Sequence, residues 1–161
     1  SAFTTNVVLI RPDSRGSVRL TSRDPTAPPA IVFNHLAAED DARRLIAALR
    51  QTRRLLRMPA MTPYAGDEIE PGPAAVDDAS LEAQLRARGS SVFHPAGTCR
   101  MGTGPDAVVD ATLRVRGVTG LRVADASVMP TLVAGNTQAA TVMIAERAAD
   151  WMLRDALAVF S

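Results

Sequence analysis

The segment from residue 39 to residue 58 carries a clear periodic signal and constrains the first part of the fold. Leucines and alanines recur there at spacings of three and four residues, with arginines between them. This is the pattern of an amphipathic helix. Asp40 and Asp41 fall in its first turn, where the helix dipole favours negative charge. The spacing therefore predicts a helix over residues 39–58 with one apolar face to bury.

Two more helices are expected further along the chain. Asp77 and Asp78 open a predicted short helix over residues 78–88, which ends near Gly89. Residues 59–76 contain four prolines and therefore predict a loop. A long helix is predicted over residues 137–153, with its buried face formed by Ala140, Met143, Ile144, Ala148, Trp151 and Met152.

Short β-branched runs predict strands between these helices. Residues 6–12 and 17–20 flank the turn-like sequence DSRG, and we interpret them as a β-hairpin. A third strand is predicted over residues 30–33. Three later runs also have strand character, namely residues 107–110, 112–118 and 121–125.

Composition and charge exclude several classes of protein. The 161 residues have the length of one ordinary domain, and 47% hydrophobic with 22% charged residues is typical of a globular chain. The formal charge of +1 lacks the basic excess of a nucleic-acid-binding protein. A single cysteine excludes an internal disulfide framework and a cysteine-based zinc site, and we expect no metal. No apolar run reaches the roughly 18 residues of a membrane helix, and the start has no secretory signal. We therefore expect a cytoplasmic protein.

Residues 91–102, SVFHPAGTCRMG, hold a dense group of chemically capable side chains. Gly97 and Gly102 have the spacing of a phosphate-binding P-loop, but Thr103 stands where that motif needs lysine, which argues against a phosphate site. Cys99 as a nucleophile would need a paired histidine, and His94 lies five residues away. We therefore interpret Cys99 as a partly buried structural thiol.

His94 allows two interpretations. A lone histidine is commonly structural. Pro95, however, favours an extended and stiff backbone at His94, which suits an imidazole that acts as a general base near neutral pH. The other histidine, His35, stands just before a predicted helix, and we interpret it as a solvent-side or capping residue.

Residues 120–146 form a second candidate region. An apolar run ends at Asp125, Ala126 and Ser127, and strand ends of this kind commonly meet cofactors. Asn136 stands directly before the last predicted helix, where it can cap the helix or donate to a substrate or cofactor oxygen. Both roles remain open for Asn136 on the residues alone. The helix start itself presents N–H groups that stabilise negative charge.

Three segments, taken in order, resemble the C-terminal signature of the glucose–methanol–choline (GMC) oxidoreductases. They are SVFHPAGTCRMG, AVVDATLRVRGVTGLRVADASVMP and GNTQAATVMIAERAAD, and their similarity is to the choline and alcohol dehydrogenase branch of bacteria. LIRPDSRGSVRL is similar to the strand–turn–strand that enters the family's substrate domain. The resemblance implies an α+β fold, with an antiparallel sheet and helices forming a substrate-binding domain over residues 1–118. Residues 119–161 would return as a strand and helix to an FAD domain.

For the site, the resemblance implies that His94 is the catalytic histidine, which takes the hydroxyl proton as hydride passes to flavin N5. Asn136 stands where the family has a second histidine or an asparagine that hydrogen-bonds the substrate oxygen. An asparagine there agrees with the choline-like branch. The residues expected beside FAD are Asp125 and Ala126 at a strand end, and Thr137 and Gln138 through their backbone at the helix start.

The implied reaction is the oxidation of a primary alcohol, choline or another, to its aldehyde. The sequence lacks the G-x-G-x-x-G motif of the family's FAD domain, so we expect a C-terminal portion of a longer enzyme. On its own we expect it to be inactive, to bind FAD weakly, and to associate into dimers or larger assemblies through the face meant for the FAD domain. The alternative is a catalytically inert binding or interaction module of the same fold.

Overall fold

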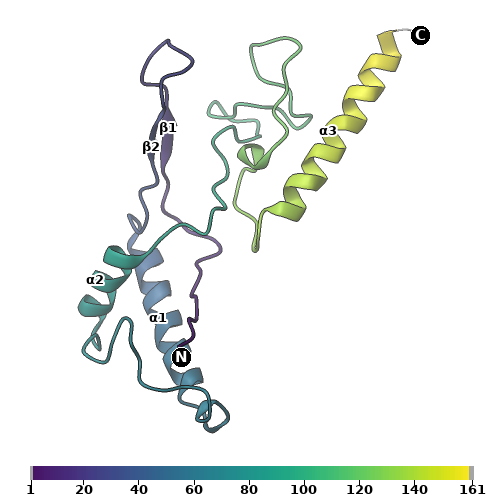
Figure 1. Cartoon of the computed structure of the whole chain (residues 1–161). Coiled ribbons are helices and arrows are strands. Elements are labelled where there is room, and N and C mark those ends of the chain that lie inside the picture. Colours follow the sequence, from purple (N-terminus) through teal and green to yellow (C-terminus); the bar gives the residue numbers. More distant parts are fainter. Residues whose placement is uncertain (1, 160–161) are drawn as a thin grey trace. The chain divides into compact units, whose positions relative to one another are not determined.

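Helix α1 (Glu39–Leu56) is the main element of the first of two units, Ser1–Val92, in a computed structural model that describes residues 2–159 (Figure 1). Its first turn is acidic and its last turn basic, which complements the helix dipole. The helix ends two residues earlier than predicted. Pro59 favours an extended backbone at Met58, and the short helix η1 (Pro59–Met61) follows.

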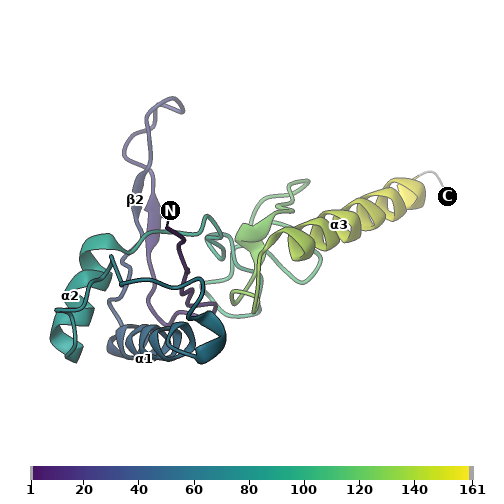
Figure 2. The same ribbon diagram turned by 60° about the horizontal axis from the view of Figure 1, so that its bottom comes forward.

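Helix α2 (Asp78–Arg88) has the predicted bounds and lies beside α1 (Figures 1 and 2). Asp77 caps it, because its carboxylate accepts the backbone N–H of Ser80 at 2.7 Å. Ile46 of α1, Leu81 of α2 and Ala75 of the preceding loop form the buried core of this unit. The apolar face predicted for the first helix therefore packs mainly on α2 and its loop.

The sheet of the first unit differs from the predicted hairpin. Strand β1 (Ser17–Arg19) pairs antiparallel with β2 (Ala30–Val32), with Val18 opposite Ile31. Residues 6–12 form no strand, so the hairpin of residues 6–12 with 17–20 is wrong. The expected turn at Asp13 and Ser14 is instead bound to α1.

Asp41 makes that attachment. Its side chain is fully buried and accepts the backbone N–H groups of Asp13 and Ser14, each at 2.8 Å, and the Ser14 hydroxyl at 2.5 Å. Burial raises the pKa of Asp41, but the hydrogen bonds from Ser14 and Asp13 and the charge of Arg44 outweigh it. The pKa of Asp41 therefore lies below its ordinary value of 3.8.

Helix α3 (Gln138–Val159) dominates the second unit, Phe93–Ser161 (Figure 1). It starts one residue later than predicted and continues beyond residue 153. Met143 and Met152, which were predicted to lie on its buried face, are instead exposed. Ile144 and Ala148 of this helix pack on Val128 and Met129, which lie at the end of the short helix η2 (Ala126–Val128). Val109 and Leu113 complete the buried cluster.

The three strands predicted before η2 are wrong as continuous strands. Residues 107–125 make only isolated bridges, which pair Val109 with Met101 and Val115, and Arg114 with Arg122. The chain reverses too often for a ladder to extend. The Asp110 carboxylate accepts the N–H groups of Thr112 at 2.8 Å and Arg114 at 3.0 Å, and positive φ angles occur at Leu113, Gly117 and Gly120.

The predicted α+β class with antiparallel pairing is confirmed, although the sheet among residues 2–159 has two strands. The division into residues 1–118 and 119–161 concerned the domains of a longer enzyme and stays a prediction. None of the helices among the described residues combines the length and hydrophobicity of a membrane-spanning segment.

Candidate active site

The loop that follows His94 is held by backbone hydrogen bonds to η2. The N–H of Cys99 donates to the carbonyl of Ser127 at 2.9 Å, and the N–H of Met101 donates to the carbonyl of Val128 at 2.8 Å. A longer bond of 3.4 Å connects the N–H of Gly97 to the carbonyl of Ala126. Because Val128 is buried in the core, these bonds give the His94 loop a defined position on the second unit.

Gly97 makes the close approach of these two segments possible. Its φ is +87°, and a Cβ atom at this position would lie 3.2 Å from the carbonyl oxygen of Met129. Left-handed backbone is costly for residues with a side chain. Steric constraints therefore explain why residue 97 is a glycine, independently of any phosphate-binding role.

His94 contacts the start of α3. Its Nδ1 atom lies 2.9 Å from Oγ1 of Thr137, a residue 43 positions later. The histidine is half-buried and lies outside any helix or strand. Among the described residues no hydrogen bond to Nε2 of His94 is found, so this nitrogen is the one left for another molecule.

Thr137 occupies the N-cap position of α3. Capping this helix was one of the two roles expected for Asn136. The helix begins at Gln138, and the Thr137 carbonyl accepts the N–H of Thr141 at 2.9 Å. Asn136 lies one residue outside the helix and is exposed, without a hydrogen bond to any residue of the described part. The capping interpretation of Asn136 is therefore wrong, and its amide is free to meet a ligand.

Asp125 and Ala126 lie at the start of η2. The exposed Asp125 carboxylate accepts the backbone N–H and the hydroxyl of Ser127, the first at 2.8 Å. The carbonyl of Ala126 accepts the N–H of Gly97. These two residues therefore begin a short helix, and the strand predicted over residues 121–125 is reduced to an isolated bridge at Arg122. Ala126 connects directly to the His94 loop.

All six candidate residues belong to the second unit. His94 and Thr137 are in direct contact, Ala126 is bonded to the His94 loop, and the others are their chain neighbours Asp125, Asn136 and Gln138. Cys99 is half-buried, as predicted. His35 lies in the first unit, where it is exposed and stacks on Phe33, which agrees with a solvent-side residue.

The side chain of Thr137 contacts the candidate base, although only its backbone was expected at the site. The predicted helix began at Thr137, with Asn136 as the candidate cap. No pattern in the sequence connects it to a histidine 43 residues earlier.

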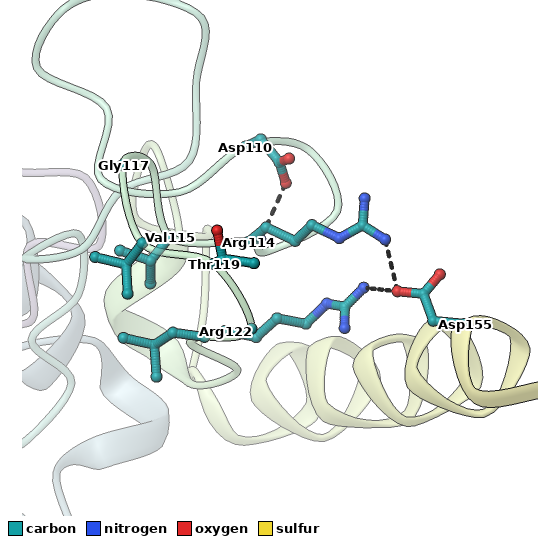
Figure 3. Close-up of a pocket in the computed structure, with 10 residues that line it drawn as sticks. Asp110, Arg114, Val115, Gly117, Thr119, Arg122 and Asp155 are labelled. Atoms are coloured by element: carbon teal, nitrogen blue, oxygen red, sulfur yellow. Dashed lines mark hydrogen bonds and ion pairs between the residues drawn. The ribbon is translucent and has the colours of Figure 1, made fainter. Parts of the chain in front are cut away.

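A separate pocket of the second unit lies between α3 and residues 110–122 (Figure 3). Arg114 and Arg122 both donate to one oxygen of Asp155, each at 2.6 Å. The hydrogen bonds from Arg122 and Arg114 lower the pKa of Asp155. None of the six candidate residues lines this pocket, and its charges are already paired with one another, so it is not the candidate site.

The start of α3 offers donors to a cofactor. The first N–H groups of a helix have no partner within it, Gln138 and Ala139 are exposed, and the Thr137 hydroxyl bonds to His94 rather than capping the turn. The helix has 22 residues, so its N-terminus also carries the positive end of a long dipole. This set suits the carbonyl-rich pyrimidine edge of a flavin.

Comparisons with known proteins identify the family of the chain. Residues 12–145 match the family described as GMC oxidoreductase. An oxygen-dependent choline dehydrogenase of Proteus mirabilis is 46% identical over 148 residues, which is 92% of this chain and 27% of that protein. The chain therefore spans about a quarter of the length of the curated relatives it matches.

Solved structures are similar over the same portion. The crystal structure of pyridoxine 4-oxidase from Mesorbium loti has a TM-score of 0.82 and 37% identity, covering 88% of this chain and 28% of that one. An FAD-dependent oxidoreductase from Chaetomium thermophilum has a TM-score of 0.84 and 30% identity, covering 91% of this chain and 26% of that one.

Proposed function

The chain belongs to the GMC oxidoreductase family, and from this premise we propose that it supplies the catalytic histidine of an FAD-dependent alcohol oxidoreductase. The proposed reaction converts a primary alcohol to its aldehyde. The observation that carries the proposal is the contact between His94 and Thr137, which brings the candidate base to the start of α3. This is also where the free amide of Asn136 and the open helix N–H groups lie.

The residues proposed to hold FAD are Asp125 and Ala126 at η2 and the backbone of Thr137 and Gln138 at α3. Bound FAD would supply the hydride acceptor, N5 of the flavin. The unpaired N–H groups and the dipole of α3 stabilise negative charge at the adjoining ring edge. The exposure of Asp125 and Gln138 leaves both segments open to such a ligand.

His94 and Asn136 act on the substrate hydroxyl in this proposal. Nε2 of His94 takes the hydroxyl proton, and the Asn136 amide donates a hydrogen bond to the same oxygen. The hydrogen bond orients the alcohol and stabilises the negative charge that develops on its oxygen. Proton transfer and hydride loss from the adjacent carbon together leave the aldehyde.

The substrate class follows from the relatives. One is named for choline and one for pyridoxine, and both compounds are alcohols. We propose a small primary alcohol of the choline type, because the relative with 46% identity is named for it.

The exposed apolar side chains of α3 support a role for this helix in a larger enzyme. Val142, Met143, Met152 and Leu153 are all about half exposed or more, and apolar patches of this kind commonly mark interfaces. We propose that they pack against the FAD domain. Without that domain, the same surface would favour self-association.

The proposed base is tested by His94→Ala in the full-length enzyme. The rate of flavin reduction by choline should fall by about 10²–10⁴-fold, the scale of general-base catalysis. His35→Ala is the matched control, because His35 is exposed on the other unit and its loss should leave the rate unchanged. Flavin reduction near the wild-type rate in His94→Ala would refute the assignment.

A further inference from the structure

We propose that Thr137 is a positioning residue for His94, whose hydroxyl oxygen accepts a hydrogen bond from Nδ1–H and so leaves Nε2 unprotonated for the substrate. The two atoms are 2.9 Å apart, which is a normal hydrogen-bond distance. The inference deepens the proposed function and rests on it, because it concerns which nitrogen of the base carries the proton.

The use of the Thr137 hydroxyl is unusual for its place in the fold. An N-cap threonine normally accepts a backbone N–H of the first helical turn. In the described part of the chain, Oγ1 of Thr137 instead has Nδ1 of His94 as its hydrogen-bond partner. Thr137 therefore lacks the usual N-cap hydrogen bond, although the residue is only 7% exposed. The hydrogen bond to His94 replaces the cap bond and fixes the orientation of the imidazole.

The direction of the hydrogen bond follows from the chemistry required of His94. A neutral imidazole carries one ring hydrogen, and the other nitrogen has the free lone pair. Nδ1 is engaged with Thr137, and Nε2 has no hydrogen-bond partner among residues 2–159. If Nε2 is to accept the substrate proton, Nδ1 must carry the hydrogen and donate it to Thr137. The threonine thus selects the reactive tautomer, as partners of other catalytic histidines do.

Nuclear magnetic resonance of the ¹⁵N-histidine-labelled chain tests the tautomer directly. The chain has only two histidines, so its imidazole spectrum contains two spin systems, and His35→Gln identifies that of His94. We expect the Nδ1–H form for His94, and a partial change to the Nε2–H form in Thr137→Val. The Nε2–H form in the unmutated chain would overturn the inference, whatever the activity of the enzyme.

Kinetics of the full-length flavoenzyme supply the second arm. Thr137→Val should lower the rate of flavin reduction by as much as about 10²-fold with little change in substrate affinity, because misplacement of a reacting group has effects of this size. Thr137→Ser retains the hydroxyl and should restore most of the rate. Thr141→Val removes a hydroxyl one turn later, which bonds to the Thr137 carbonyl, and serves as the control for changes in α3.

The NMR and kinetic experiments distinguish failure of the Thr137 role from failure of the proposed function. A Thr137→Val variant that reduces flavin as fast as wild type would overturn the positioning role of Thr137, whereas the role of His94 as the base is refuted only by a near-wild-type rate in His94→Ala. Equal loss of rate in the Ser and Val variants would overturn the role of the hydroxyl, since only the Val variant lacks it.

Discussion

Nδ1 of His94 lies 2.9 Å from Oγ1 of Thr137, and this contact joins a loop to the first residue before α3. The other end of the same loop is bonded through Cys99 and Met101 to η2. The imidazole is therefore fixed by two elements that also form the hydrophobic core of the second unit. The loop, the proposed role of Asn136 and the attachment of the end of α3 can each be tested by a separate substitution.

Replacing Gly97 with alanine tests the loop. A Cβ atom there would lie 3.2 Å from the Met129 carbonyl oxygen at a φ of +87°, so we expect a loss of about 1–2 kcal/mol in the free energy of unfolding. Flavin reduction in the full-length enzyme should slow as well, because the loop carries His94. Gly104→Ala is the control, since its Cβ would meet nothing within 4 Å. Urea unfolding that is equal for the two variants would contradict the steric argument.

Replacing Asn136 with alanine separates capping from substrate binding. Asn136 is exposed and lies outside the helix, so the free energy of unfolding should change by less than about 0.5 kcal/mol. The rate of flavin reduction should fall by up to about 10²–10³-fold, the effect of losing a donor to a developing oxyanion. Thr131→Ala, an exposed change in the same loop, should alter neither quantity. An unchanged rate in Asn136→Ala would exclude the bond to the substrate oxygen.

Replacing Asp41 with asparagine tests the anchor of the first unit. The side chain is fully buried and accepts three hydrogen bonds from Asp13 and Ser14, and the amide retains only one acceptor oxygen. We expect the free energy of unfolding to fall by about 1–3 kcal/mol. Asp40→Asn is the control, because Asp40 is partly exposed and, among the described residues, pairs only with arginine side chains of α1.

The contribution of Asp41 also depends on pH. Its pKa is lower in the folded chain than the ordinary 3.8, so the unfolded chain binds the proton more tightly. The stabilisation is therefore fully present well above pH 3.8 and is lost as the pH falls through 3.8 and the lower folded value. Unfolding curves of wild type and Asp41→Asn should converge in acid. A gap that widens on acidification would show that the pKa shift has the opposite sign.

Replacing Asp155 with asparagine tests the attachment of the end of α3. Arg114 and Arg122 both donate to this carboxylate at 2.6 Å (Figure 3), and both come from the chain segment before η2. Amide hydrogens of the last turns of α3 should exchange faster in the variant, and added salt should reduce the difference. Asp150→Asn is the matched control, because within residues 2–159 Asp150 pairs only with Arg147 and Arg154 of the same helix. Equal exchange in both variants would contradict the long-range attachment.

The helices were predictable because their hydrogen bonds are local. Each bond joins residues four apart, so the apolar spacing and the flanking residues Asp77 and Gly89 mark α2 completely in the sequence. Helix α1 ends two residues before the predicted residue 58, because Pro59 favours an extended backbone at Met58. The start of α3 lies one residue later than predicted, because Thr137 and not Asn136 stands directly before the first helical residue.

The strands were not predictable to the same degree, because a strand is defined by its partner. Residues 6–12 have the composition of a strand, but Asp41 binds the turn that would have formed their hairpin. Val109 and Val115 likewise make bridges rather than a ladder. Asp110 and the positive φ angles turn the chain before a second pair can form.

The sequence by itself determined the α-helices, the two histidines and the GMC motifs that single out His94 and Asn136. Only the tertiary structure decided that Nδ1 of His94 is bonded to Thr137 and that Asn136 is free of the helix cap. The physical reason is that periodicity and caps depend on neighbours along the chain. A side-chain contact across 43 residues instead depends on how η2, the His94 loop and α3 pack around one core.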